Sequence, residues 1–415
     1  MSETLDFKRI IREGDTLAWT GGTGEPAQSL TQLNAQIDEV PRASVLVNLA
    51  LTNTLDAARF ARRMHIKALG GAGTNRRYQD AGALDVLPAH YSNLPEFVAQ
   101  GVIRIDVAMV QLAGSDGDLR LTPMLDHVLD AVPRARVVIG ELNDQAPVLT
   151  GDTGIADTDI DHLLRVSYPI IEVKETPPGP AERAIGEHVA RMIPDGATLQ
   201  VGLGTLPDAV LEALSGKKDL GLHSGTIADG VAKLVDAGVI TNRLKAIDTG
   251  LTVTAGLIGT KRLYAWAHNN PKLRVRSPRY THDYLVTSQI PKLFGINSAL
   301  EVDLTGQFNA EVAGTKHIGL VGGHADFMRG CVRSKGGRGI VVMQATARGG
   351  SISRIVPKLA GGIVTTSRSD ADVVVTEYGM AELRGRTVSE RADALIAIAH
   401  PDFRDKLRAE AEGLI

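Results

Sequence analysis

An internal repeat constrains the fold of this chain more than any other feature of its sequence. Six residues in a segment that begins at residue 11 recur, each 182 positions later, in a segment that begins at residue 193. The matching pairs are Ile11 and Ile193, Gly14 and Gly196, Thr16 and Thr198, Leu17 and Leu199, Gly22 and Gly204, and Thr23 and Thr205. Each copy reads as a glycine turn, a short apolar strand, a Gly-Thr loop and a helix that opens at a proline. The repeat therefore predicts two related α/β domains.

Short β-branched runs alternate with helical stretches along the rest of the chain. Examples are residues 136–140, 339–343 and 372–376. Continuous apolar strands between helices are typical of parallel sheets that are covered on both faces. We expect two open α/β domains with mostly parallel sheets.

A proline-rich segment marks the expected boundary between the two domains. A chain of 415 residues exceeds the usual domain length of about 100–200 residues. Residues 175–181 contain three prolines, which continue neither a helix nor a strand ladder, and the amphipathic pattern of 181–193 predicts the helix that follows. We expect an N-terminal domain at 1–178 and a C-terminal domain at 179–415.

The composition excludes several classes of protein. Lysine and arginine number 45 against 48 acidic residues, with no basic block, so we expect no nucleic-acid partner. No apolar run approaches the roughly 18 residues of a membrane span, and the first residues lack a signal-peptide pattern, so a cytoplasmic protein is expected. Cys331 is the one cysteine, and no His, Asp or Glu grouping has metal-ligand spacing, so we expect no disulfide and no metal.

Three glycine-rich turns are candidate ligand sites. The first, 202–207, joins a strand to a helix, where free backbone N–H groups favour an anion, although a plain packing turn explains the same glycines. The second, 322–330, contains His324, which is either a base or a hydrogen-bonded structural residue. The third, 344–350, holds Arg348, which either reaches a phosphate or lies in solvent.

A strand with alternating character is expected near residue 302. Leu300, Val302 and Leu304 would share one face, and Glu301, Asp303 and Thr305 the other. The polar row either lines a cleft or faces water.

Several of these segments together resemble one known family. Residues 296–330, 351–357 (SISRIVP), 374–386 (VVTEYGMAELRGR) and 399–404 (AHPDFR) closely resemble the acetyl-CoA hydrolase/transferase family of class I CoA-transferases. The resemblance implies a class I CoA-transferase-like pair of α/β domains and a CoA thioester as substrate, with no permanently bound cofactor. It also implies a homodimer or homotetramer, with an acyl-CoA and a small carboxylate as partners.

The same resemblance implies which residues contact CoA and how the family transfers it. The implied contacts are Gly202, Leu203, Gly204, Thr205, Gly322, Gly323, Thr346 and Arg348. In the family, a glutamate carboxylate attacks the acyl-CoA, and the resulting enzyme thioester passes CoA to a second carboxylate.

This chain departs from the family at the nucleophile. The family's glutamate follows a His-Ser or His-Thr pair, and here His223 and Ser224 are followed by Gly225, which has no side chain. Ser224 with His223 as its base is a candidate replacement, although neighbours on a strand point to opposite faces. Glu25 in the first repeat is another, whereas Glu301 accompanies the nucleophile in the family and is expected to be structural.

Three functions therefore stay open. The first is CoA transfer between an acyl-CoA and a carboxylate, through a surrogate carboxylate or by direct attack of the acceptor. The second is hydrolysis of an acyl-CoA, at the thioester or at a carbon–carbon bond, by water held in the space beside Gly225. The third is a non-catalytic CoA-thioester binding protein. If the positional assignment is correct, Gly225→Glu should create CoA transfer through an enzyme thioester.

Overall fold

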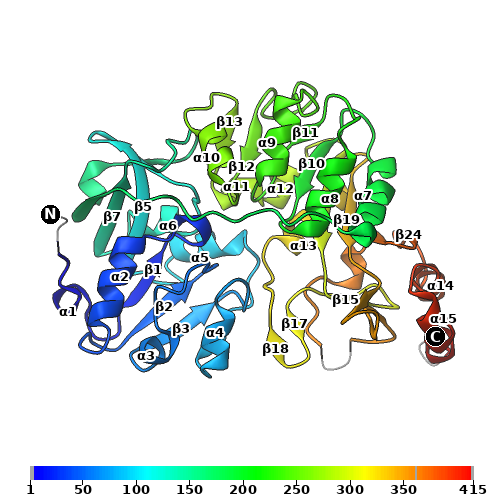
Figure 1. Ribbon diagram of the computed structural model, residues 1–415, viewed down its shortest axis with the longest axis horizontal. Coiled ribbons are helices and arrows are strands. Elements are labelled where there is room, and N and C mark those ends of the chain that lie inside the picture. The colour runs from blue at the N-terminus through cyan, green and yellow to red at the C-terminus, as the bar shows by residue number, and fades with distance from the viewer. Residues whose placement is uncertain (1–3, 360–361, 413–415) are drawn as a thin grey trace. The chain divides into compact units, whose positions relative to one another are not determined.

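The computed structural model describes residues 4–359 and 362–412, and the chain forms two compact units (Figure 1). The first unit comprises Met1–Lys174, Val253–Thr281 and Lys316–Gly322. The second comprises Glu175–Thr252, His282–Thr315 and Gly323–Ile415. Two segments from the later part of the chain thus belong to the first unit. The domain boundary expected between residues 178 and 179 stays a prediction.

Within the described residues, the first unit is built on a nine-stranded sheet. Its order is β4-β3-β2-β1-β5-β6-β8, and β7 pairs with β5 and β9. The long strand β5 pairs in parallel with β1 and β7 through its first half and antiparallel with β6 through its second half. The strands are β1 (Thr16–Trp19), β2 (Ala43–Val47), β3 (Met64–Ala68), β4 (Leu84–Val86), β5 (Val107–Ser115), β6 (Asp118–Leu121), β7 (Val137–Asn143), β8 (Gly154–Ile155) and β9 (His162–Val166).

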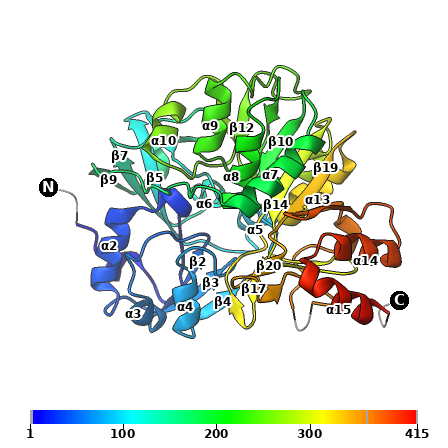
Figure 2. The same cartoon turned by 45° about the vertical axis from the view of Figure 1, so that its right-hand side comes forward.

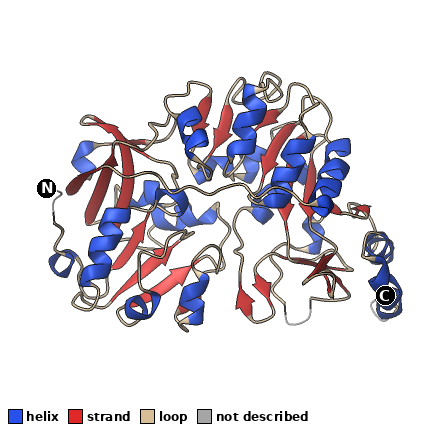
Figure 3. Cartoon of the chain, viewed as in Figure 1, coloured by secondary structure: helices blue, strands red, loops and turns tan. Residues whose placement is uncertain are grey.

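The helices of this unit are blue in Figure 3, and several of them lie beside the nine-stranded sheet. They are α1 (Phe7–Ile10), α2 (Ala27–Gln36), α3 (Ala57–Ala61), α4 (Arg76–Asp80), α5 (Asn93–Ala99), α6 (Val128–Ala131), α10 (Lys261–Ala267) and α11 (Pro278–Thr281). The core between helices and strands includes Leu17, Val45, Phe60, Ile66 and Tyr78, all fully buried. Alternate residues of β1, β2 and β3 supply this face, as the period of a strand requires.

The described part of the second unit contains a six-stranded sheet with the order β11-β10-β14-β19-β23-β24. The first five strands are parallel, and β24 pairs antiparallel with β23. They are β10 (Thr198–Val201), β11 (Gly221–Leu222), β14 (Leu293–Ser298), β19 (Arg338–Val342), β23 (Val373–Thr376) and β24 (Gly379–Glu382). Parallel strands bring their carboxyl ends to one edge, which is where open α/β sheets bind ligands.

The helices of the second unit are easiest to follow in Figure 2. They are α7 (Pro180–Met192), α8 (Thr205–Ala213), α9 (Asp229–Asp236), α12 (Tyr284–Thr287), α13 (His324–Arg333), α14 (Val388–Ala397) and α15 (Pro401–Ala411). Helices α7 and α8 lie side by side because Gly186 lets them approach: a Cβ there would lie 2.5 Å from the carbonyl oxygen of Ala209. Helix α13 packs on β19, where a Cβ on Gly339 would meet Met328 at 2.9 Å.

Short strands complete this unit. Strand β15 (Glu301–Asp303) pairs with β16 (Phe308–Asn309) and β22 (Ile355–Val356), and β20 (Thr346–Ala347) forms a hairpin with β21 (Ile352–Ser353).

The expected fold is confirmed, and the repeat occupies matching places in the two sheets. Strand β1 lies between parallel neighbours β2 and β5, and β10 lies between parallel neighbours β11 and β14. Helix α8 begins at Thr205, two residues before the expected start at Pro207. Proline is tolerated there because the N–H groups of a first helical turn have no helical acceptor.

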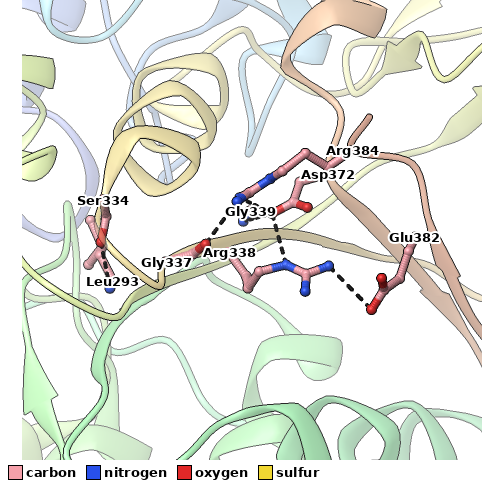
Figure 4. A network of polar contacts seen from close by, with 8 residues as sticks. All are labelled: Leu293, Ser334, Gly337, Arg338, Gly339, Asp372, Glu382 and Arg384. Carbon is pink, nitrogen blue, oxygen red and sulfur yellow. Dashed lines mark hydrogen bonds and ion pairs between the residues drawn. The ribbon is translucent and has the colours of Figure 1, made fainter. Parts of the chain in front are cut away.

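A buried carboxylate links three strands of the second unit (Figure 4). It lies at the edge of the sheet opposite the carboxyl ends of the parallel strands. Asp372 precedes β23 and accepts hydrogen bonds from Gly339 N at 2.9 Å, Arg338 Nε at 3.2 Å and an Arg384 guanidinium nitrogen at 2.6 Å. Arg338 also lies 3.5 Å from a Glu382 carboxylate oxygen. One fully buried carboxylate thus holds β19, β23 and the end of β24 in register.

Candidate functional site

A cavity of about 260 Å³ lies at the carboxyl ends of β10, β14 and β19. Its lining includes Gly204, Thr205 and Leu206 at the start of α8, Ser298 at the end of β14, Gln344 after β19, Glu182 of α7, and Arg354. All of these residues belong to the second unit. The cavity therefore lies where ligands of parallel α/β sheets bind.

The start of α8 opens onto this cavity because of Gly204. Its φ is +116°, a conformation that only glycine adopts easily, and it is the residue that precedes the first turn of the helix. The backbone thereby turns from the end of β10 directly into α8. A helix N-terminus presents N–H groups and a partial positive charge, which suits an anion or a polarised carbonyl oxygen.

Arg354 supplies a positive side chain to the same cavity. It is half-buried, and its Nε donates to the carbonyl oxygen of Thr346 at 3.2 Å. Burial lowers its pKa below the ordinary arginine value, while the carboxylates of Glu301 and Glu377 act in the opposite direction. Arginine remains charged at neutral pH, so the guanidinium is a fixed cation at the cavity.

The equivalent helix end in the first repeat, the start of α2, has different neighbours. The amides of Gln28 and Ser29 at the start of α2 donate to the carboxylate of Glu141, and Ala27 N donates to the Tyr168 hydroxyl at 3.1 Å. Glu141 is fully buried, and burial together with its charge raises the pKa of Tyr168. A protein carboxylate thus neutralises this helix end, whereas the helix end of the second repeat opens onto a cavity.

The segment that the resemblance assigns to the family nucleophile, residues 223–225, follows β11 (Gly221–Leu222). Ser224 is fully buried, and its Oγ donates towards the carbonyl oxygens of Val201, at 3.0 Å, and Thr226, at 2.9 Å, and accepts from Val201 N at 3.2 Å. A hydroxyl has one proton, and here backbone acceptors compete for it. The contacts of Ser224 therefore join the ends of β10 and β11.

The imidazole of His282 fills the space in front of Gly225. A Cβ on Gly225 would lie 2.6 Å from His282 Nε2 and 2.7 Å from Cε1. On Gly323, which precedes α13, it would lie 2.5 Å from His282 Cδ2. The ring centroid is 4.8 Å from that of Phe327, and His282 is 4% exposed. The space beside Gly225, where we expected a water molecule, is therefore filled by the imidazole of His282.

Two of the histidines near this place, His282 and His324, are kept neutral by burial. Burial, with a smaller contribution from His223, lowers the pKa of His282 to about 3. Burial lowers the pKa of His324 to about 4, and its Nδ1 lies 2.7 Å from Thr366 Oγ1. His324 is thus a hydrogen-bonded residue of the α13 start.

The remaining predicted residues are distributed over both units. Gly322, with φ of +54°, ends the last segment of the first unit. Arg348, with φ of +49°, is exposed at the tip of the β20–β21 hairpin. Glu25 belongs to the first unit, where its carboxylate accepts from Leu51 N and the Thr52 hydroxyl, and burial raises its pKa.

The polar row near residue 302 does not line the cavity described above, and Asp303 and Thr305 are buried while Glu301 is half-buried. Asp303 is 1% exposed and accepts from the backbone N–H groups of Thr305 and Gln307, each at 3.0 Å, and from both their side chains. Glu301 accepts from Asn309 Nδ2 at 3.1 Å. These carboxylates hold the turn that follows β15.

Four residues of this region are not indicated by the sequence patterns: Glu182, Ser298, Arg354 and His282. Arg354 lies inside the quoted SISRIVP segment, so the motif was visible but its arginine was not singled out. His282 carries no motif of its own, and nothing in its local pattern indicates contact with Gly225.

Two further properties concern the described residues as a whole. No helix within 4–359 and 362–412 is long and apolar enough to cross a membrane. Over the same ranges, no three His, Cys, Asp or Glu side chains are grouped so that they would hold a metal ion.

Comparison with known proteins gives consistent matches along the chain. Residues 2–176 match the family model of the acetyl-CoA hydrolase/transferase N-terminal domain, and residues 259–411 match that of the C-terminal domain. The 4-hydroxybutyrate coenzyme A transferase of Clostridium kluyveri is 42% identical over 84% of this chain and 82% of its own length. The succinyl-CoA:cyclohexane-1-carboxylate CoA transferase of Geobacter metallireducens is 34% identical over 98% of this chain and 94% of its own length. The crystal structure of RipA from Yersinia pestis has a TM-score of 0.91 at 29% identity, over 98% of this chain and 96% of that chain.

Proposed function

Because the chain belongs to the acetyl-CoA hydrolase/transferase family, we propose that it transfers CoA between an acyl-CoA and a small carboxylate. The proposed activity is assigned to particular residues because of the cavity at the start of α8, which Arg354 helps to line. Relatives of this chain are named as CoA transferases, and the cavity offers the positive groups that an acyl-CoA needs.

In this proposal, the positive groups at the cavity stabilise the oxygen of the thioester carbonyl during the reaction. When a nucleophile attacks the carbonyl carbon, negative charge develops on the oxygen, and fixed N–H donors stabilise it. We assign this role to the backbone of Gly204 and Thr205, with Arg354 as the nearby cation. Gly202 and Leu203 complete the loop, and the roles of Gly322, Gly323 and Arg348 stay predictions.

Without a carboxylate at residue 225, the acceptor itself would attack. Its carboxylate oxygen forms a bond to the acyl carbon, the C–S bond breaks, and CoA leaves as the thiolate. The thiolate then attacks the acceptor half of the mixed anhydride, which releases the first acyl group as a carboxylate. This route needs both substrates bound at once, in contrast to the family's covalent route.

Hydrolysis is the second candidate. Because the ring of His282 fills the space beside Gly225, water would reach the acyl carbon from the cavity at the start of α8 instead. A site that forms no covalent enzyme thioester leaves the acyl carbon open to any small nucleophile, water included. The family's name covers hydrolases and transferases alike. The location in the cytoplasm and assembly into a homodimer or homotetramer are further proposals, and light scattering on the purified chain tests the second.

The deciding experiment is mass spectrometry of the CoA products from a panel of acyl-CoAs, with and without acetate or succinate. A new acyl-CoA that appears only with the added carboxylate supports transfer. Free CoA or a ring-opened acyl-CoA that appears regardless supports hydrolysis. Binding of CoA thioesters without any turnover would overturn both and leave a binding protein.

A further inference from the structure

The ring of His282 lies in a slot between two glycines. Its Nε2 would be 2.6 Å from a Cβ on Gly225 and 2.7 Å from a Cβ on Gly323. Phe327 closes the slot, because its ring atoms would lie 3.5 Å and 3.4 Å from the same two Cβ positions. All four residues belong to the second unit.

The backbone does not require glycine at either wall of the slot. Gly323 has φ of −90°, and φ of Gly225 also lies outside the left-handed region, in contrast to Gly204 at +116°. An L-amino acid therefore fits the backbone at both positions. What excludes a side chain there is the imidazole, since non-bonded atoms do not approach to 2.6 Å.

The three residues therefore form one set, in which a ring at 282 requires the absence of side chains at 225 and 323. A carboxylate side chain from residue 225 and the imidazole of His282 would occupy the same volume, and a close-packed interior holds only one of them. Burial keeps the ring neutral, with its pKa near 3, so it fills this volume without adding a charge.

We propose that His282 keeps the position of Gly225 free of a reactive side chain by occupying the volume that such a side chain would need. Even a carboxylate introduced at residue 225 would therefore be kept from forming an enzyme thioester while the ring is in place. This inference rests on the proposed function, and it makes His282 a specificity-determining residue rather than a catalytic one.

The route that the ring closes can be written in full. An introduced carboxylate at 225 would attack the acyl carbon, so that a C–O bond forms, the C–S bond breaks and the CoA thiolate leaves. The thiolate would then attack the carbonyl of the introduced side chain. That step releases the acyl group as a free carboxylate and leaves CoA joined to the enzyme by a thioester.

The test compares Gly225→Glu with Gly225→Glu/His282→Ala. Each variant is incubated with an acyl-CoA that the wild type processes, and intact mass reports a CoA adduct that borohydride removes. The double variant should form the adduct, whereas the single variant should form little or none. This revises the expectation from the sequence that Gly225→Glu alone would create the enzyme thioester, because the ring of His282 lies where the new side chain would be. Gly216→Glu/His282→Ala is the matched control, since a Cβ on Gly216 meets nothing within 4 Å. Equal adduct in the single and double variants, or none in a folded double variant that still binds CoA, overturns the inference.

A second measurement covers variants that fail to fold and needs no substrate. Thermal unfolding is measured for Gly225→Ala, His282→Ala and the pair together. Removing the ring should restore most of the melting temperature that Gly225→Ala loses, and additive losses would overturn the inference. If the wild type processes no acyl-CoA, the proposed function fails, whereas this thermal cycle still decides whether the ring excludes a side chain at 225.

Discussion

A Cβ atom on Gly225 would lie 2.6 Å from Nε2 of His282, closer than non-bonded atoms approach in folded proteins. Gly225, which the family resemblance assigns to the position of the nucleophile, is thus one half of a packed contact. The ring of His282 takes the volume that a side chain at residue 225 would need.

The contact predicts a non-additive loss of stability. Gly225→Ala and Gly323→Ala should each lower the free energy of unfolding by about 1–3 kcal/mol, the usual cost of forcing a methyl group into a packed site. Because both methyl groups displace the same ring, the double variant should lose clearly less than the sum. Urea denaturation measures all three, and Gly216→Ala, which meets nothing, should change little. Full additivity would show that the two glycines do not share the ring.

Arg354, rather than Arg348, should govern the binding of CoA thioesters. Arg354 lines the cavity at the start of α8, while Arg348 is exposed at a hairpin tip. Losing one hydrogen bond to a charged group costs about 1.5–3 kcal/mol, so Arg354→Gln should weaken binding about 10- to 100-fold. Titration calorimetry with CoA and acetyl-CoA measures the effect. If Arg348→Gln weakened binding by the same factor, the prediction would be wrong, and Arg348 would be a ligand contact as the sequence analysis expected.

Stability should fall as the pH drops below about 6.5. The pKa of His282 is lowered from 6.5 to about 3 by burial, so between these values the unfolded chain binds a proton that the folded chain does not. The free energy of unfolding then rises with pH by about 1.4 kcal/mol per pH unit because of this proton. The contribution of His282 reaches its full value above the pKa of the unfolded chain. His324, lowered to about 4, acts in the same direction.

The check is urea denaturation across that window for the wild type and His282→Ala. The variant starts from a lower stability, but its curve should be shallower between about pH 4 and pH 6 because one of the linked protons is gone. Parallel curves would contradict the assignment.

Asp372→Asn should destabilise the second sheet. Asp372 is fully buried, and both guanidinium groups that it accepts from would lose their carboxylate. Breaking such a pair costs about 3 kcal/mol, at the lower end for buried pairs because Arg338 and Arg384 still reach solvent. Thermal unfolding measures the loss. The exposed pair of Asp405 and Arg408 is the control, and Asp405→Asn should stay within about 0.5 kcal/mol of the wild type.

Much of the fold could be predicted from the sequence because its causes are local. The repeat between residues 11 and 205 predicted two related α/β folds, and the β-branched runs correspond to β7, β19 and β23. Apolar periodicity and proline placement act over a few residues, so a single sequence reveals them. The assignment of 253–281 and 316–322 to the first unit was not predictable, since it depends on packing against distant strands.

The candidate site divides in the same way. The sequence by itself determined that a Gly-Thr loop ends β10 and opens α8, and that residue 225 has no side chain. Only the tertiary structure decided that Glu141 neutralises the helix end of the first repeat while Arg354 stands beside that of the second. It also decided that His282 fills the space before Gly225. A glycine in a sequence shows only that a side chain is absent. Which distant residue fills the space beside it depends on how the chain folds.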